Sequence, residues 1–156
     1  KKYHFDVIRG NLGEIAVLAG IDWQTRGIDA GNGDGDAHQV VKACAQKYHN
    51  VVIASGATDY VSDGTRVVEI HNQTRLLPAV VGSGDLLSSL AAAFCAVGPT
   101  PLQAAINASL TLSCAGERVA EKLHDQYLPG SFLNGLMDEL ANITVAQVEE
   151  RMKVEE

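Results

Sequence analysis

The feature that most restricts how this chain can fold is a glycine-rich turn, Gly82-Ser83-Gly84-Asp85, that leads directly into a segment of small and apolar residues. Residues 86–97 are apolar on every face of the helix that they predict, and the pattern stops at Gly98-Pro99. A helix that is apolar all round is normally buried. We therefore expect the start of this helix, together with its turn, to be held deep in the protein.

The turn itself has the composition of an anion-binding site. Two glycines at a helix start let a phosphate approach the main chain, while free N–H groups and the helix dipole point at the anion. Asp85, in the first turn, could accept the proton of a substrate hydroxyl as that hydroxyl attacks the terminal phosphate of a nucleotide. The alternative is a glycine turn whose aspartate only stabilises the helix N-terminus.

A second candidate site follows a short apolar strand near the start of the chain. Asn11 and Glu14 are spaced three apart at the start of a predicted helix over residues 11–19, so both can face one Mg²⁺ and phosphate site, usually through water. The same spacing is typical of a capping box, which is worth about 1 kcal/mol for structural reasons alone. Arg9, just before them, suits either a phosphate or a buried carboxylate.

The remaining patterns alternate between strands and helices. The order of these elements favours an α/β sandwich with helices packed on a largely parallel sheet. A polar hairpin is predicted over residues 59–70, and we expect it at a sheet edge. Ligands in such sheets bind at the carboxyl ends of strands, where both candidate sites lie. The predicted elements after residue 20 are a helix over 37–48, a strand over 51–54, a hairpin over 59–70 turning at Asp63-Gly64, a strand over 76–81, a helix from a capping box at Thr100 and Gln103 to about His124, a helix from Pro129, and a charged helix over 144–156.

Composition excludes several classes of function. The 156 residues are 46% hydrophobic and carry a formal net charge of −7, which suits one globular domain over residues 1–156. Lys and Arg form no basic stripe, so we do not expect a nucleic-acid partner. The longest uninterrupted apolar run, residues 90–97, is far shorter than the roughly 20 residues that a membrane span needs.

The sequence suggests no metal cluster. Cys44, Cys95 and Cys114 fall inside apolar helical patterns without zinc-site spacing, which predicts reduced core residues and a cytoplasmic location. No two of the five histidines have metal-ligand spacing on a common helix, so we assign them no chemistry. Residues 26–36 begin like a calcium loop but lack its glycine and glutamate at the required positions, which predicts a flexible surface loop.

Several segments, in order, resemble the hydroxyethylthiazole kinases of thiamin salvage, a family with a ribokinase-like fold. The resemblance covers nearly the whole chain and implies an enzyme that uses ATP and Mg²⁺ to phosphorylate the primary alcohol of a thiazole. The matching segments are Val7-Ile8-Arg9-Gly10-Asn11 with Glu14, Arg26-Gly27-Ile28-Asp29, Ala54-Ser55-Gly56 with Asp59-Tyr60-Val61 and Asp63-Gly64, Gly82-Ser83-Gly84-Asp85, and Pro129-Gly130-Ser131-Phe132.

The resemblance also implies a role for each matching site residue. Two positions depart from the commonest family pattern: Ser55 is usually Thr, and Asp85 is frequently Cys, although Asp is the residue there in most ribokinase-like kinases. The implied roles are contacts to ATP for Arg9, Ser55, Ser83 and Gly84, organisation of Mg²⁺ and phosphate through water for Asn11 and Glu14, contact with the acceptor substrate for Gly82, and general base for Asp85.

Family members carry a further N-terminal portion before the position of Lys1, and they are homotrimers with active sites between subunits. The resemblance therefore implies either a homotrimer or association with that missing portion. Alone, this chain would leave a sheet edge and an apolar helix face uncovered, so we expect association or instability.

Two alternative functions remain. One is a nucleotide-dependent NAD(P)H-hydrate dehydratase of the same fold, and the other is a non-catalytic nucleotide-binding or assembly module. The run from Arg9 to Glu14 and the turn at residues 129–132 favour the kinase over the dehydratase.

Overall fold

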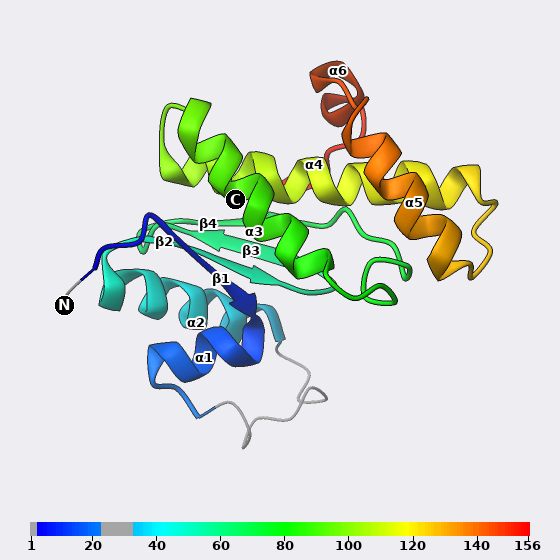
Figure 1. Ribbon diagram of the computed structural model, residues 1–156. Helices are drawn as coiled ribbons and strands as arrows, with labels where there is room; N and C mark the ends of the chain where they lie inside the picture. The colour runs from blue at the N-terminus through cyan, green and yellow to red at the C-terminus, as the bar shows by residue number, and fades with distance from the viewer. Residues whose placement is uncertain (1–2, 23–32) are drawn as a thin grey trace.

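The computed structural model describes residues 3–22 and 33–156 and arranges them as helices on both faces of one sheet (Figure 1). In chain order the elements are β1 (Val7–Asn11), α1 (Leu12–Ala19), α2 (Gly33–Tyr48), β2 (Val51–Ser55), β3 (Asp59–Ser62), β4 (Val67–Ile70), α3 (Ser83–Val97), α4 (Pro101–Lys122), α5 (Pro129–Leu140), α6 (Val145–Glu149) and β5 (Val154–Glu155).

The predicted α/β class is confirmed, but the sheet within this chain is mixed. Its strands follow the order β1-β2-β3-β4-β5, and only β1 and β2 run parallel. The hairpin and the C-terminal strand supply the antiparallel pairs. The prediction of a terminal helix over 144–156 is therefore wrong beyond Glu149, because Val154 and Glu155 extend to pair with Ile70 and Glu69. For the same reason the hairpin does not lie at the sheet edge.

Alternate residues along each central strand face opposite helical layers. Val52 and Ala54 pack in the core with α1 and α2, whereas Val51 and Ile53 pack in the core with α3, α4 and α5. Figure 1 shows these two layers below and above the sheet. Burial of each valine or isoleucine side chain contributes about 1.5–3 kcal/mol. The two-residue period of the strands is what divides the hydrophobic core into two parts.

The capping box predicted at the start of α1 is present, and the one predicted at the start of α4 is present in part. Thr100 Oγ1 accepts a hydrogen bond from Gln103 N at 3.2 Å, as a capping residue does. The Gln103 side chain, however, donates to Asn107 Oδ1 one turn further along instead of reaching back to the cap. Only the first half of the predicted capping box forms at this end.

Two segments differ from the predicted elements. Residues 76–81 form turns instead of a strand, because their N–H groups bond locally, as from Ala79 N to Leu76 O at 3.1 Å, and Pro78 has none to donate. The predicted loop over 26–36 is helical from Gly33, and its earlier part lies outside the described residues. Glycine is tolerated at the start of a helix better than in its interior, which explains the longer α2.

Helix α3 is buried on one face only. Leu87 and Ala91 are its buried residues, and Cys95 is partly exposed, unlike Cys44 and Cys114. The prediction of a helix buried all round is wrong here because no element among residues 3–22 and 33–156 covers its outer face. All three cysteines are free thiols. None of the helices in the described part of the chain combines the length and apolar character that a membrane crossing requires.

Candidate functional site

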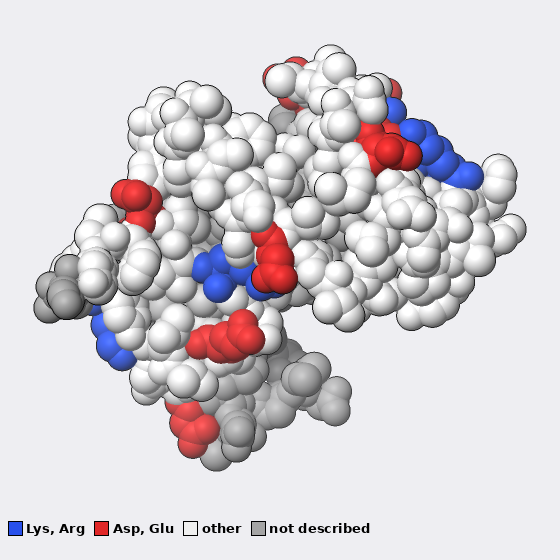
Figure 2. All heavy atoms as spheres, in the orientation of Figure 1, with Lys and Arg blue, Asp and Glu red and all other residues white. Residues whose placement is uncertain are grey.

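The site forms where β1 and β2 end and α3 begins. The two strands are parallel, with Asn11 opposite Ser55, so their carboxyl ends meet at one edge of the sheet. Arg9 Nη2 donates a hydrogen bond of 2.8 Å to Ser55 Oγ across this edge. Figure 2 shows basic atoms between two acidic groups at the centre of this face. A single guanidinium therefore links the two strands at the predicted site.

Gly84 brings the start of α3 onto the same guanidinium. A Cβ at this position would lie only 2.2 Å from Arg9 Nη1 and 2.4 Å from Arg9 Nη2. The absence of a side chain is what lets the helix backbone and the guanidinium approach so closely. A larger residue than glycine at position 84 would clash with the Arg9 guanidinium.

The start of α3 and Arg9 both carry hydrogen-bond donors without a partner among the described residues. Gly82, at the N-cap of α3, has a φ of 92° and provides no side-chain cap, so the first N–H groups of the helix have no intrahelical acceptor. The buried Nε atom of Arg9 likewise has no hydrogen-bond partner among the described residues. Ser83 and Gly84 line the adjacent cavity. These donors, together with the helix dipole, form a site suited to a phosphate.

Asn11 and Glu14 form the capping box that their spacing allows. Asn11 Oδ1 accepts from Glu14 N at 2.9 Å, and Glu14 Oε2 accepts from Asn11 N at 2.8 Å. Each side chain still has acceptor capacity, and carboxylate and amide oxygens suit Mg²⁺ held through water. Asn11 lines the cavity, whereas Glu14 lies outside its lining. The residues fit a magnesium ion, and they also stabilise α1.

Asp85 is exposed in the first turn of α3. Its carboxylate makes no hydrogen bond or ion pair that involves the described residues, so it is available to a substrate. Neither Asp85 nor Gly82 belongs to the lining of the cavity. Asp85 is exposed to solvent, and Gly82 is partly exposed.

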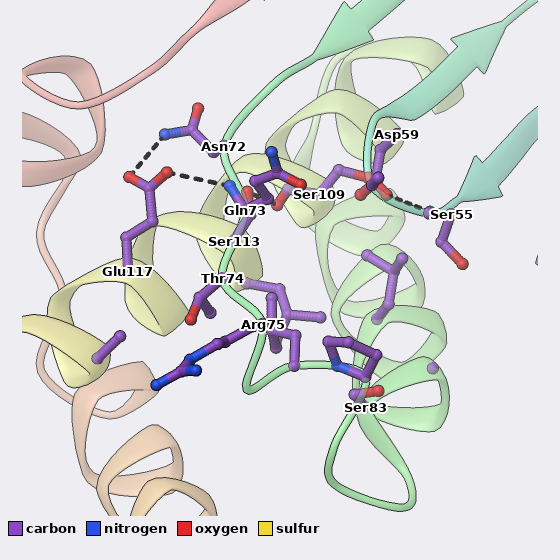
Figure 3. Close-up of a pocket in the computed structure, with 18 of the residues that line it drawn as sticks. Ser55, Asp59, Asn72, Gln73, Thr74, Arg75, Ser83, Ser109, Ser113 and Glu117 are labelled. Atoms are coloured by element: carbon purple, nitrogen blue, oxygen red, sulfur yellow. Dashed lines mark hydrogen bonds between the residues drawn. The ribbon is translucent and has the colours of Figure 1, made fainter. Parts of the chain in front are cut away.

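The cavity beside the anion site has a volume of about 1020 Å³. Figure 3 shows that the residues after β4 and one face of α4 form much of its wall. Sequence reasoning missed this part of the site. The signal was a stripe of polar residues at four-residue spacing on a helix rich in Ala and Leu, namely Ser109, Ser113 and Glu117.

Glu117 fixes the loop that follows β4. Its carboxylate accepts hydrogen bonds from Asn72 Nδ2 and Gln73 N, both at 3.0 Å, and from Lys153 Nζ at 2.9 Å. Figure 3 shows it reaching from α4 to Asn72 and Gln73. The buried Asn72 also accepts from Lys153 N at 2.8 Å. One wall of the cavity is therefore held in place by the C-terminal segment.

Asp59 is a second acidic group that sequence reasoning did not assign to the site. Burial raises the pKa of its carboxyl to about 6, although the N–H of Gly56, the hydroxyl of Ser109 and the charge of Arg9 each act to lower it. Its Oδ1 accepts from Gly56 N at 3.0 Å. Asp59 thus places a titratable carboxyl within the electrostatic range of Arg9.

A helix N-terminus with free amides, at the carboxyl edge of a sheet and beside an arginine, is an arrangement found in α/β proteins that bind phosphorylated ligands. The profile of the hydroxyethylthiazole kinase family matches residues 1–146, and the chain belongs to this family. The resemblance noted in the sequence is therefore confirmed.

Individual relatives agree with this assignment. A hydroxyethylthiazole kinase from Pediococcus pentosaceus is 69% identical over 156 residues, which are 100% of this chain and 59% of that protein. One from Levilactobacillus brevis is 54% identical over 147 residues, 94% of this chain and 56% of that protein. The chain thus spans less than two thirds of the length of these relatives.

A solved structure supports the fold as well as the family. The structure of a hydroxyethylthiazole kinase protein from Pyrococcus horikoshii OT3 superposes with a TM-score of 0.82 at 34% identity. The match covers 96% of this chain and 54% of that one.

Proposed function

We propose that this chain forms the phosphate-binding part of a hydroxyethylthiazole kinase, which transfers the γ-phosphate of ATP to the primary alcohol of the thiazole. The observation that carries the proposal is the convergence of Arg9, Ser55 and Gly84, where the two Nη atoms of the guanidinium lie against the start of α3 and its buried Nε has no hydrogen-bond partner among the described residues. The family of the chain and the names of its relatives support the choice of acceptor.

In this proposal the phosphates of ATP lie between Arg9 and the first turn of α3. Ser83 and Gly84 donate backbone N–H groups, and Arg9 and Ser55 bind phosphate oxygens. Gly82 lies against the acceptor. Asp85 takes the proton of the hydroxyl as its oxygen bonds to the γ-phosphorus, while the bond from that phosphorus to the β,γ-bridging oxygen breaks and ADP leaves.

A magnesium ion would neutralise charge on the transferring phosphate. Asn11 and Glu14 would hold it through water, since both keep acceptor capacity beside their capping bonds. This role adds to the cap that both residues provide for α1.

We further propose that residues 1–156 act as one domain in the cytoplasm, as part of a larger assembly. The three free cysteines support a reducing location. The exposed face of α3 and the unpaired edge of β1 within the described residues support a covering partner, either a homotrimer or the N-terminal portion of the relatives.

The test is an assay of the completed assembly. The chain is combined with the N-terminal portion of a relative and incubated with ATP, Mg²⁺ and hydroxyethylthiazole, and thiazole phosphate is measured by mass spectrometry. We expect product formation that depends on both ATP and thiazole. Absence of product from a folded assembly would refute the proposal, and turnover of hydrated NADH would identify the dehydratase instead.

The role of Asp85 has its own test. We predict that Asp85→Asn lowers kcat by at least about 10²-fold with little change in nucleotide affinity, because the amide cannot accept the hydroxyl proton. Steady-state kinetics and nucleotide titration measure the two effects. An unchanged kcat would mean that Asp85 serves only the helix start.

A further inference from the structure

Three potential metal ligands meet at the β4–β5 end of the sheet, and a histidine adjoins them. The three are Glu69 on β4, His71 directly after β4, and Glu155 on β5, and the adjoining residue is His38 on α2. His38 Nε2 lies 2.5 Å from Glu69 Oε1. His71 Nε2 lies 3.3 Å from Glu69 Oε2 and 3.8 Å from Glu155 Oε2. None of the four lines the cavity.

The environment of His71 suits a cation. Its Nε2 atom is buried and makes no hydrogen bond to any described residue, although two carboxylates face it. The other ring nitrogen, Nδ1, lies 3.4 Å from Thr58 Oγ1. In the tautomer that carries the proton on Nδ1, beside Thr58 Oγ1, the lone pair of Nε2 faces Glu69 and Glu155. Metal-binding histidines are commonly oriented by such a second bond.

The negative charges of Glu69 and Glu155 also favour a bound cation. Glu69 and Glu155 are direct partners across β4 and β5, an arrangement of like charges that destabilises a strand pair. A divalent cation between them would turn this repulsion into attraction. It would also tie the short C-terminal strand to β4 and, through His38, to α2.

The distances suit a tetrahedral ion. Metal–ligand bonds of about 2.0–2.2 Å at tetrahedral angles place ligand atoms about 3.4 Å apart. The two separations from His71 Nε2, 3.3 and 3.8 Å, lie near this value. The His38 ring is held edge-on against Tyr60 with ring centroids 5.7 Å apart.

From this arrangement we propose that Glu69, His71 and Glu155 form a structural site for a first-row transition-metal dication, with Zn²⁺ as the representative ion, and that His38 orients the carboxylate of Glu69. An imidazole and two carboxylates suit Zn²⁺, whereas Mg²⁺ prefers oxygen ligands alone. The site is independent of the proposed kinase activity.

The experiment is a zinc titration of the tag-free, chelator-treated chain by isothermal calorimetry. We expect one equivalent of Zn²⁺ to bind and Mg²⁺ to give no such isotherm. Co²⁺ should show the intense visible bands of four-coordinate geometry, and zinc should raise the Tm because it binds only the folded state.

Variants decide whether these residues are the ligands. His71→Ala and Glu69→Gln should each weaken zinc binding at least about tenfold. His4→Ala, which alters an exposed histidine near the N-terminus, is the matched control and should bind as the wild type does. Circular dichroism checks that each variant is folded. Absence of saturable zinc binding, or equal affinity in the wild type, His71→Ala and Glu69→Gln, would overturn the proposal.

Discussion

The contact between Arg9 and Gly84 is the most demanding single feature of the candidate site. The guanidinium occupies the space where a side chain at position 84 would begin. Gly84 therefore sets the position of Arg9 as well as the path of the helix start. Two residues that are 75 positions apart in the sequence thus constrain each other directly.

We predict that Gly84→Ala displaces the Arg9 guanidinium and weakens nucleotide binding by roughly 10- to 100-fold, the loss of one charge-assisted hydrogen bond. Calorimetric titration with ATP measures the effect. Gly130→Ala is the matched control, because a Cβ at Gly130 would meet nothing within 4 Å. Equal ATP affinity in both variants would contradict the assigned role of Gly84.

The carboxyl of Asp59 makes stability depend on pH. Burial raises its pKa from the ordinary value of 3.8 to about 6 in the folded protein. Between these values the folded state binds more protons than the unfolded chain, so stability falls as the pH rises through this window.

We therefore predict that the free energy of unfolding of the wild type, relative to Asp59→Asn, decreases as the pH rises from about 4 to about 6 and then levels off. Urea denaturation at a series of pH values measures it. Asp138→Asn, at an exposed position on α5, is the control. A constant difference between wild type and Asp59→Asn over this range would show that Asp59 does not titrate there.

At the scale of elements, a buried carboxylate joins α4 to α5. Glu139 on α5 is 4% exposed and accepts hydrogen bonds from Arg118 and Lys122 on α4. Burial alone would raise the pKa of Glu139, but the hydrogen bonds from Lys122 and Arg118 outweigh it and hold the pKa below its ordinary value. The pair of helices therefore depends on an ion pair as well as on apolar packing.

We predict that Glu139→Ala destabilises the protein by about 2 kcal/mol, because it removes the hydrogen bonds to Arg118 and Lys122 and leaves a gap where a buried side chain packed. Chemical denaturation measures the change. Asp138→Ala, one residue away and exposed, should shift the free energy of unfolding by no more than about 0.5 kcal/mol. Similar small shifts for both variants would show that the ion pair contributes little.

The elements also show where sequence patterns succeed. The capping box of Asn11 and Glu14 and the end of α1 at Gly20 are local features, and both were predictable. The turns at residues 76–81 were not predicted, because an apolar run does not reveal whether a neighbouring strand exists to pair with it. Strand β5 was missed for the same reason, since its pairing partner is β4.

At the scale of the whole molecule, an open strand edge and an apolar helix face have no partner among the described residues. Strand β1 pairs only with β2, and the outer face of α3 is exposed, with Val97 at 83% exposure. An open strand edge and an apolar helix face both favour association. This agrees with a chain that spans 59% of a 69%-identical relative.

We predict that the chain associates with itself in a concentration-dependent manner, and that Ala93→Lys on the exposed face of α3 weakens this association at least about tenfold by placing a charge on an apolar surface. Sedimentation velocity measures the effect. Ala146→Lys, exposed on α6, is the control. A stable monomer at all concentrations would contradict the prediction.

The family, the α/β class, most helices and the residues of the candidate phosphate site could be predicted from the sequence, because motifs, periodicity, caps and glycine turns are local. Tertiary packing brings together residues that are distant along the chain: Arg9 with Gly84, the polar face of α4 with the loop after β4, and both His38 and His71 with Glu69. The five histidines carry no metal spacing along the chain, yet two of them share the carboxylate of Glu69. Strand pairing and helix packing bring together residues that are far apart in the sequence, and a local sequence pattern cannot predict such contacts.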